Sequence, residues 1–66
     1  MLRKIRGLYI DTTEVAAIDI MLTNNGECMP IIILKSGHTI VTPNSYPVES
    51  AEAALDLVAR EIEVVH

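Results

Sequence analysis

The sequence predicts an α+β fold: a small antiparallel sheet of about four strands, followed by one C-terminal helix packed on one face of the sheet. Up to about residue 42, short apolar segments alternate with turn residues, a pattern typical of strands. From about residue 48, apolar residues recur every three or four positions, which is typical of an amphipathic helix. With 66 residues, the chain is long enough for one domain only, so residues 1–66 are treated as a single unit.

The N-terminal segment predicts one short strand over residues 5–10. Gly7 within this strand suggests a β-bulge or a close approach of another backbone. Asp11, Thr12 and Thr13 then form a polar break that suits a turn.

Residues 15–23 predict a second, half-buried strand. Its even positions form one apolar row, whereas its odd positions are mixed, with Val15, Ala17, Asp19 and Met21. The residues of the even row are Ala16, Ile18, Ile20 and Leu22. The tripeptide Asn24-Asn25-Gly26 follows and supplies the residues with positive φ that a tight hairpin turn requires.

A third strand is predicted over residues 29–35 and a fourth over residues 38–42, with Ser36-Gly37 as the turn between them. Proline cannot donate a ladder hydrogen bond, so Pro30 is expected at the start of the third strand or on an edge. The third strand is apolar on both faces, because its centre is the consecutive run Ile31, Ile32, Ile33 and Leu34.

Residues 43–47 predict a loop, and residues 48–63 predict the helix. Pro47 suits the first helical position or the one before it, and Ser45 or Ser50 is a candidate N-cap. The apolar stripe of the helix consists of Val48, Ala51, Leu55, Val58 and Ile62. A neighbouring face is acidic, with Glu49, Glu52, Asp56 and Glu63. We interpret these acids as the solvated side of the helix, and alternatively as a docking face for a basic partner.

A domain of this size usually needs a disulfide, a metal or another subunit to be stable. Cys28 is the only cysteine, so no intrachain disulfide is possible, and a reducing, cytoplasmic location is expected. His38 and His66 are the only histidines, and no metal-ligand spacing links them to Cys28, so neither a metal nor a cofactor is expected. Of the three means of stabilising so small a domain, association with another subunit is the one that remains.

The net charge of −4 arises from five basic and nine acidic residues. Three of the five cations, Arg3, Lys4 and Arg6, lie within the first six residues. So few cations, together with the absence of Trp and Phe, argue against a nucleic-acid partner. The longest apolar run, residues 29–34, is too short to span a membrane, so no membrane association is expected.

A single helix covers one face of the sheet, so the side chains of the third strand on the other face need another cover. Either Ile31 and Ile33, or Ile32 and Leu34, point away from the helix, and Val15 and Met21 are expected to join them. Leaving two or three such side chains in water would forgo a free energy comparable to the roughly 3–5 kcal/mol stability of so small a domain. We therefore expect a homo-oligomer, most simply a symmetric dimer. The candidate interface residues are Met21, Ile31, Ile32, Ile33, Leu34, Tyr46 and Leu57.

The sequence offers little catalytic chemistry, and no catalytic residue is assigned. His38 is the only internal histidine and is expected to be a solvated turn residue. Asp11 and Glu14 could pair as carboxylates, but in a turn such residues usually act as local caps.

The segment Tyr9-Ile10-Asp11, the strands and hairpins that follow, and a helix that begins near Ser50-Ala51 together resemble small bacterial and bacteriophage proteins of unassigned function. The resemblance implies a sheet-plus-helix fold and an origin in a phage or mobile element. Phage proteins of this size are often inhibitors of a host enzyme or defence complex, which is an analogy of size and fold.

Two functions are therefore considered. The first is a non-enzymatic protein-interaction or oligomerisation module, such as an inhibitor or accessory protein. The alternative is a small-ligand binder or enzyme with a site at the oligomer interface near His38, for which Tyr9, Cys28 and Asp19 would be further candidates.

Overall fold

The computed structural model describes residues 2–63 and shows the expected α+β architecture. Within this range, six strands and two 3-10 turns precede the helix, and all strand pairs are antiparallel. The strands are β1 (Leu2–Ile5), β2 (Leu8–Asp11), β3 (Val15–Leu22), β4 (Glu27–Leu34), β5 (Thr39–Val41) and β6 (Tyr46–Pro47). The helical segments are η1 (Thr12–Glu14), η2 (Val48–Ser50) and α1 (Ala51–Ile62).

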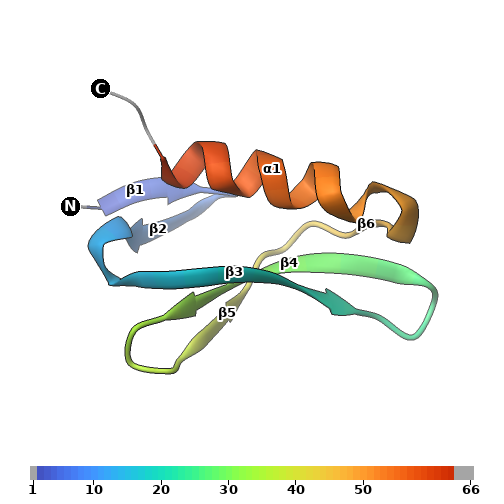
Figure 1. Ribbon diagram of the computed structural model, residues 1–66, viewed down its shortest axis with the longest axis horizontal. Coiled ribbons are helices and arrows are strands. Elements are labelled where there is room, and N and C mark those ends of the chain that lie inside the picture. Colours follow the sequence, from blue (N-terminus) through green and yellow to red (C-terminus); the bar gives the residue numbers. More distant parts are fainter. Residues whose placement is uncertain (1, 64–66) are drawn as a thin grey trace.

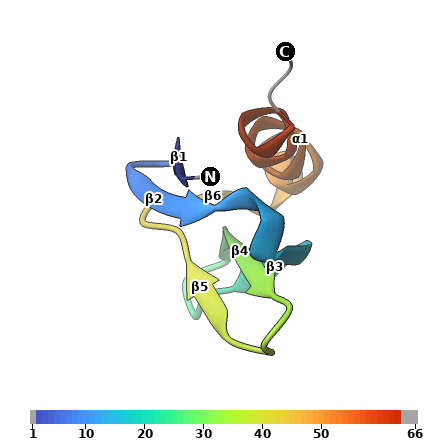
Figure 2. The ribbon, with the colours of Figure 1, turned by 90° about the vertical axis from the view of Figure 1, so that its left-hand side faces the viewer.

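Two sheets share one helix. The larger sheet has the order β3-β4-β5, with β6 paired to β4, and β1 and β2 form a separate hairpin. Helix α1 contacts β3, β4 and β1, so the hairpin and the larger sheet close around the same core (Figure 1, Figure 2). The buried centre of this core consists of Ile5, Ile10, Ile32 and Val58.

The prediction of a single strand over residues 5–10 is wrong, because the chain reverses at Arg6 and Gly7. Both residues have positive φ, 50° and 86°, which is the geometry of a two-residue type I′ hairpin turn. Gly7 is therefore a turn residue and not a bulge. The turn folds the segment into two four-residue strands that bury Ile5 and Ile10 side by side on the core.

The register of β3 explains a second difference. The pairing shifts between Val15 and Ala17, so a bulge at the start of β3 turns Val15 toward the core, where it packs against the buried cluster. Val15 therefore does not join the residues that point away from the helix. In the predicted even row, Ile18 and Ile20 are half-buried, whereas Ala16 at the bulge and Leu22 at the strand end are exposed.

Pro30 lies inside the central strand β4, against the expectation of a strand start or an edge. It sits between the part of β4 that pairs with β5, residues 31–33, and the part that pairs with β6, residues 27–28. No partner strand requires an N–H group at this point, so proline is tolerated. Thr42 is fully buried and donates both its N–H and its hydroxyl to the Pro30 carbonyl, at 3.1 and 2.8 Å.

The helix follows its prediction closely. Residues 48–50 form the 3-10 turn η2, and α1 then runs from Ala51 to Ile62. Ala54 and Val58 are buried, and Ile62 packs on the core, whereas Val48 is exposed. Ser50 occupies the N-cap position without a side-chain cap hydrogen bond. The C-terminal Val64, Val65 and His66 lie outside the described residues.

At the 3-10 turn η1, the Asp11 carboxylate accepts hydrogen bonds from the Thr13 N–H and hydroxyl, at 3.0 and 2.7 Å. The predicted polar break is thus a capped turn.

No helix within residues 2–63 is both long enough and apolar enough to cross a membrane.

Candidate functional site

The side of the β3-β4-β5 sheet that faces away from α1 is the candidate site, and we call it the outer face. In an antiparallel ladder, directly paired residues lie on the same face. Ile32 is paired with Ile18 and Ile40 and is fully buried, so this row faces the core. The neighbouring rows face outward. The outer-face residues are Ala17, Asp19, Met21, Met29, Ile31, Ile33, Thr39 and Val41.

The centre of the outer face is apolar and its margins carry the polar groups. The central strand β4 contributes Met29, Ile31 and Ile33, which are all half-buried. Asp19 on β3 and Thr39 on β5 flank them on either side and are exposed. No helix or hairpin among the described residues lies on this side of the sheet (Figure 1, Figure 2). An apolar centre with a polar rim is the usual anatomy of a protein–protein interface.

Two exposed apolar side chains extend the outer face at its edges. Met21 retains 39% of its surface exposed and Val41 retains 43%. Met21 lies directly across from Met29, and Val41 directly across from Ile31. The apolar surface is therefore continuous across the three strands.

The structure distinguishes between the two alternatives for the third strand. Ile31 and Ile33 point away from the helix. The expectation that Ile32 or Leu34 contributes to an interface is wrong, because Ile32 is fully buried and Leu34 packs against the core. Leu57 is 38% exposed, but it belongs to α1, which covers the opposite face of the sheet.

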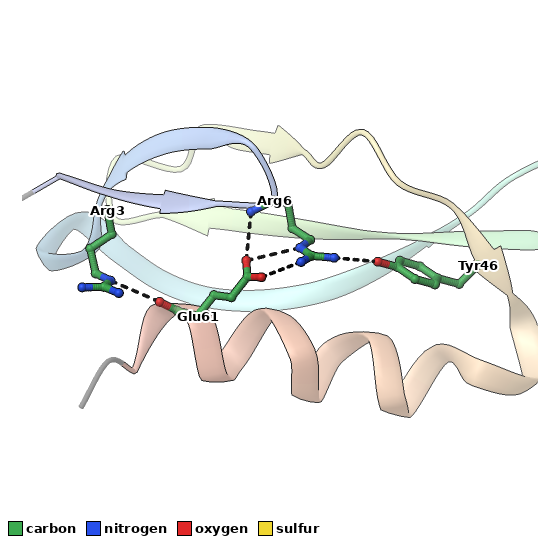
Figure 3. A network of polar contacts seen from close by, with 4 residues as sticks. All are labelled: Arg3, Arg6, Tyr46 and Glu61. Atoms are coloured by element: carbon green, nitrogen blue, oxygen red, sulfur yellow. Dashed lines mark hydrogen bonds and ion pairs between the residues drawn. The ribbon is translucent and has the colours of Figure 1, made fainter. Parts of the chain in front are cut away.

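Tyr46 belongs to a polar network that ties the β1–β2 hairpin to α1 (Figure 3). Its hydroxyl accepts a hydrogen bond from Nη1 of Arg6 at 3.1 Å. Arg6 also donates three hydrogen bonds to the Glu61 carboxylate: from its backbone N–H at 2.9 Å, from Nε at 3.2 Å and from Nη2 at 2.6 Å. Arg3 donates from Nε to the Glu61 carbonyl at 3.3 Å.

An open polar cavity of about 390 Å³ lies beside this network and is lined by Lys4, Arg6, Gly7, Asn44 and Glu61. The hydrogen bonds from Arg6 hold the pKa of the Glu61 carboxyl below its usual range, and the same pair raises the pKa of Arg6. A carboxylate with a lowered pKa is a weak proton acceptor at neutral pH. Glu61 therefore has a structural role: its hydrogen bonds with Arg6 hold the β1–β2 hairpin against α1.

The four acidic residues predicted as a docking face are all exposed. Glu49 lies in η2, before the helix proper. Glu52 and Asp56 lie within α1, and Glu63 is its C-cap. Their spacing of four and seven residues puts Glu52, Asp56 and Glu63 on one side of the helix.

Two of the residues considered for a ligand site, His38 and Cys28, do not lie together. His38 is exposed in the turn after β4, where its carbonyl accepts from the Leu34 N–H, whereas Cys28 is buried near the other end of the same strand. Six residue-to-residue steps of extended strand lead from Cys28 to Leu34, a distance of about 20 Å. Within residues 2–63, no group of three or more His, Cys, Asp or Glu side chains is arranged to hold a metal ion.

Sequence reasoning missed Met29 and Val41 as outer-face residues, and it missed the Arg6–Glu61 pair. The signal for Met29 was present, because positions 29, 31 and 33 alternate on one face of a strand. The pair of Arg6 and Glu61 left no such signal, because 55 residues separate them and neither residue belongs to a pattern.

Comparison of the chain with models of protein families, with curated proteins and with solved structures finds no match.

Proposed function

We propose that this protein is a non-enzymatic interaction module that associates with a second copy of itself through the outer face of its larger sheet. The observation that carries the proposal is the apolar centre of that face, formed by Met29, Ile31 and Ile33 and extended by Met21 and Val41. Uncovered apolar surface that is continuous across a sheet and rimmed by polar groups is typical of a docking surface.

The low charge of the outer face permits a second copy as the occupant in one orientation. The chain carries a net charge of −4, so two copies repel each other in most orientations. The outer face carries a single carboxylate, Asp19, and this residue lies on the edge strand β3 and not at the centre. Two outer faces packed about a two-fold axis leave both Asp19 side chains at the rim, in water. Such a face is self-complementary, which a symmetric interface requires.

The expected affinity is modest. Covering an aliphatic side chain that is already partly shielded contributes about 1 kcal/mol, which is less than the value for complete burial. Five such side chains on each copy offset an association cost of about 4–15 kcal/mol. At the lower end of this cost, about 6 kcal/mol remains, which corresponds to a dimer with a Kd on the order of tens of micromolar or above.

The proposal includes two further parts. A reducing, cytoplasmic compartment is supported by Cys28, which is buried and free. An inhibitor or accessory role encoded by a phage or mobile element is supported only by the resemblance to small proteins of that kind.

Sedimentation equilibrium from about 10 µM to 1 mM tests self-association over the concentration range that this affinity requires. Met21→Lys and Val41→Lys alter exposed side chains on the outer face, so they should preserve the fold and weaken the dimer at least about tenfold. Leu57→Lys is the matched control, because Leu57 is similarly exposed but lies on the helix side. A wild-type monomer at every concentration, or equal effects of Met21→Lys and Leu57→Lys, would contradict the proposal.

A further inference from the structure

Strand β3 has an open edge. It pairs with β4 on one side, and among residues 2–63 no strand pairs with it on the other (Figure 2). The Pro30 carbonyl points toward the β5 side, so Ile20, which is paired with Pro30, directs its own backbone groups to the open edge. By the alternation of a strand, Ile18 and Leu22 do the same. Free backbone groups on an edge strand are a template for an added strand.

An apolar groove runs beside this edge, between β3 and the C-terminal half of α1. It has a volume of about 150 Å³, which is room for an aliphatic side chain. Its lining is mostly apolar and contains no cation: Val15, Ala17, Ile18, Ala59, Ile62 and Glu63. The groove and the open edge therefore offer an extended segment both backbone partners and a place for one of its side chains.

Carboxylates lie along the helix side of the groove and at the β3 edge. Glu63 lines it, and Glu52 and Asp56 continue the same side of α1 toward its N-terminus. Asp19 stands on β3 itself, where its carboxylate accepts from the Ile20 N–H at 2.8 Å. Arg60, the only cation within α1, lies four residues after Asp56 and three before Glu63, so it flanks this row and offsets one of its negative charges. The charge complement of this surface is a basic segment.

We propose that the β3 edge and the adjoining groove bind an extended, basic peptide segment of another protein, which adds to the sheet as a fifth strand. Backbone hydrogen bonds join the segment to Ile18 and Leu22, an aliphatic side chain of the segment enters the groove, and its Lys or Arg side chains lie near Asp56 and Glu63. This is recognition by strand addition. The site adjoins the outer face, with which it shares Ala17 and Asp19, but it does not depend on dimerisation there.

A second copy of this chain is a poor occupant of the same edge. Pairing two β3 edges would bring together the acidic sides of two α1 helices, and it would also bring two Asp19 side chains onto one seam. The Asp19 carboxylate already occupies the Ile20 N–H, which weakens the template for a partner that brings no cation to displace it. A basic partner supplies that cation.

The test uses the blocked hexapeptide Lys-Thr-Val-Thr-Lys-Thr, whose valine and two lysines share one face of a strand, titrated into the full ¹⁵N-labelled chain and followed by amide chemical shifts. Binding should perturb the amides of Ile18, Leu22 and Ala59, with a Kd on the order of 0.1–1 mM because a six-residue strand buries less than a standard interface. N-methylation of one alternate set of peptide amides should abolish binding, and methylation of the other set should preserve it. Binding should weaken as salt is raised from about 50 to 500 mM.

Ala59→Leu fills the groove without changing the charge and should weaken binding at least about tenfold, whereas Ala53→Leu, on the exposed side of the same helix, should not. The Met21→Lys variant should bind the peptide like the wild type, which separates this site from the proposed dimer. Three results would overturn the inference: no binding at millimolar peptide, equal loss from the two methylated peptides, or equal binding of the same hexapeptide with both lysines replaced by glutamate.

Discussion

Removal of the Glu61 side chain is the most informative single perturbation of the fold, because this carboxylate is the polar tie between the hairpin and the helix. It accepts three hydrogen bonds from Arg6, and the two side chains retain only 24% and 27% of their surface exposed. Hydrogen bonds to charged groups contribute about 1.5–3 kcal/mol, and partial exposure keeps the total near the middle of this range. Glu61→Ala should therefore cost about 2 kcal/mol of the free energy of unfolding.

Arg6→Gly should cost less, about 1 kcal/mol, although it removes the same ion pair. Arg6 occupies a left-handed turn position with φ of 50°, and a residue other than glycine pays about 1 kcal/mol there. Glycine releases this strain and keeps the backbone N–H that donates to Glu61. In the Arg6→Gly background, Glu61→Ala should then cost only about 1 kcal/mol, which gives a coupling of about 1 kcal/mol between the two positions.

Urea denaturation followed by circular dichroism measures these differences, and a loss of about 2 kcal/mol corresponds to a Tm lower by about 8–16 °C in a domain of this size. Glu63→Ala is the matched control, since it removes an exposed carboxylate from the same helix end and should change stability by no more than about 0.5 kcal/mol. If Arg6→Gly is as costly as Glu61→Ala, or if the two effects add without coupling, the reasoning about strain and shared hydrogen bonds is refuted.

Three further predictions concern pH, a buried hydroxyl and a turn. Hydrogen bonds from Arg6 lower the pKa of Glu61 in the folded protein, and those from Thr13 lower the pKa of Asp11 from 3.8 to about 2, so both groups stabilise the fold above their unfolded pKa values and lose this effect as the pH falls. Glu61→Gln should therefore be less stable than the wild type at pH 7, and urea titrations should show this difference shrinking as the pH is lowered. Thr42→Val removes the buried hydroxyl that donates to Pro30 and should cost about 1–2 kcal/mol, whereas Thr42→Ser, which keeps the donor, should cost less in thermal melts. Gly26→Ala should lower the free energy of unfolding by about 1 kcal/mol through backbone conformation alone, since φ is 77° and nothing lies within 4 Å of the added Cβ. Gly26→Asn should recover part of this loss. An unchanged Tm for the alanine variant would show that the turn adapts.

The helix and the long hairpin could be predicted from the sequence because their signals are local. The three- and four-residue spacing of Val58 and Ile62 belongs to one segment, and so does the Asn-Gly turn between β3 and β4. The N-terminal hairpin was missed because its turn uses arginine at a position that usually takes asparagine or glycine. The compensation for that choice, the pair with Glu61, lies at the other end of the chain, where no local rule can find it.

The candidate site was predictable in kind but not in detail. Four consecutive apolar residues in one strand show that both faces of the sheet are apolar, but they do not show which pair faces the helix. That choice depends on register, which the pairing of Ile32 with Ile18 determines. Likewise, the sequence showed an acidic helix face, but only the fold shows that this face stands beside an open strand edge and an apolar groove.

The central claim is that two copies meet through the outer face, and isotope-filtered nuclear Overhauser measurements on a mixture of labelled and unlabelled chains test it most directly. At about 1 mM protein, where a dimer with a Kd of tens of micromolar is mostly formed, we expect contacts between copies at the side-chain methyl groups of Met29, Ile31 and Ile33. It predicts none at Leu57. Contacts between copies that involve Leu57 or the β3 edge, with none at Ile31, would contradict it, and so would the absence of any contact between copies.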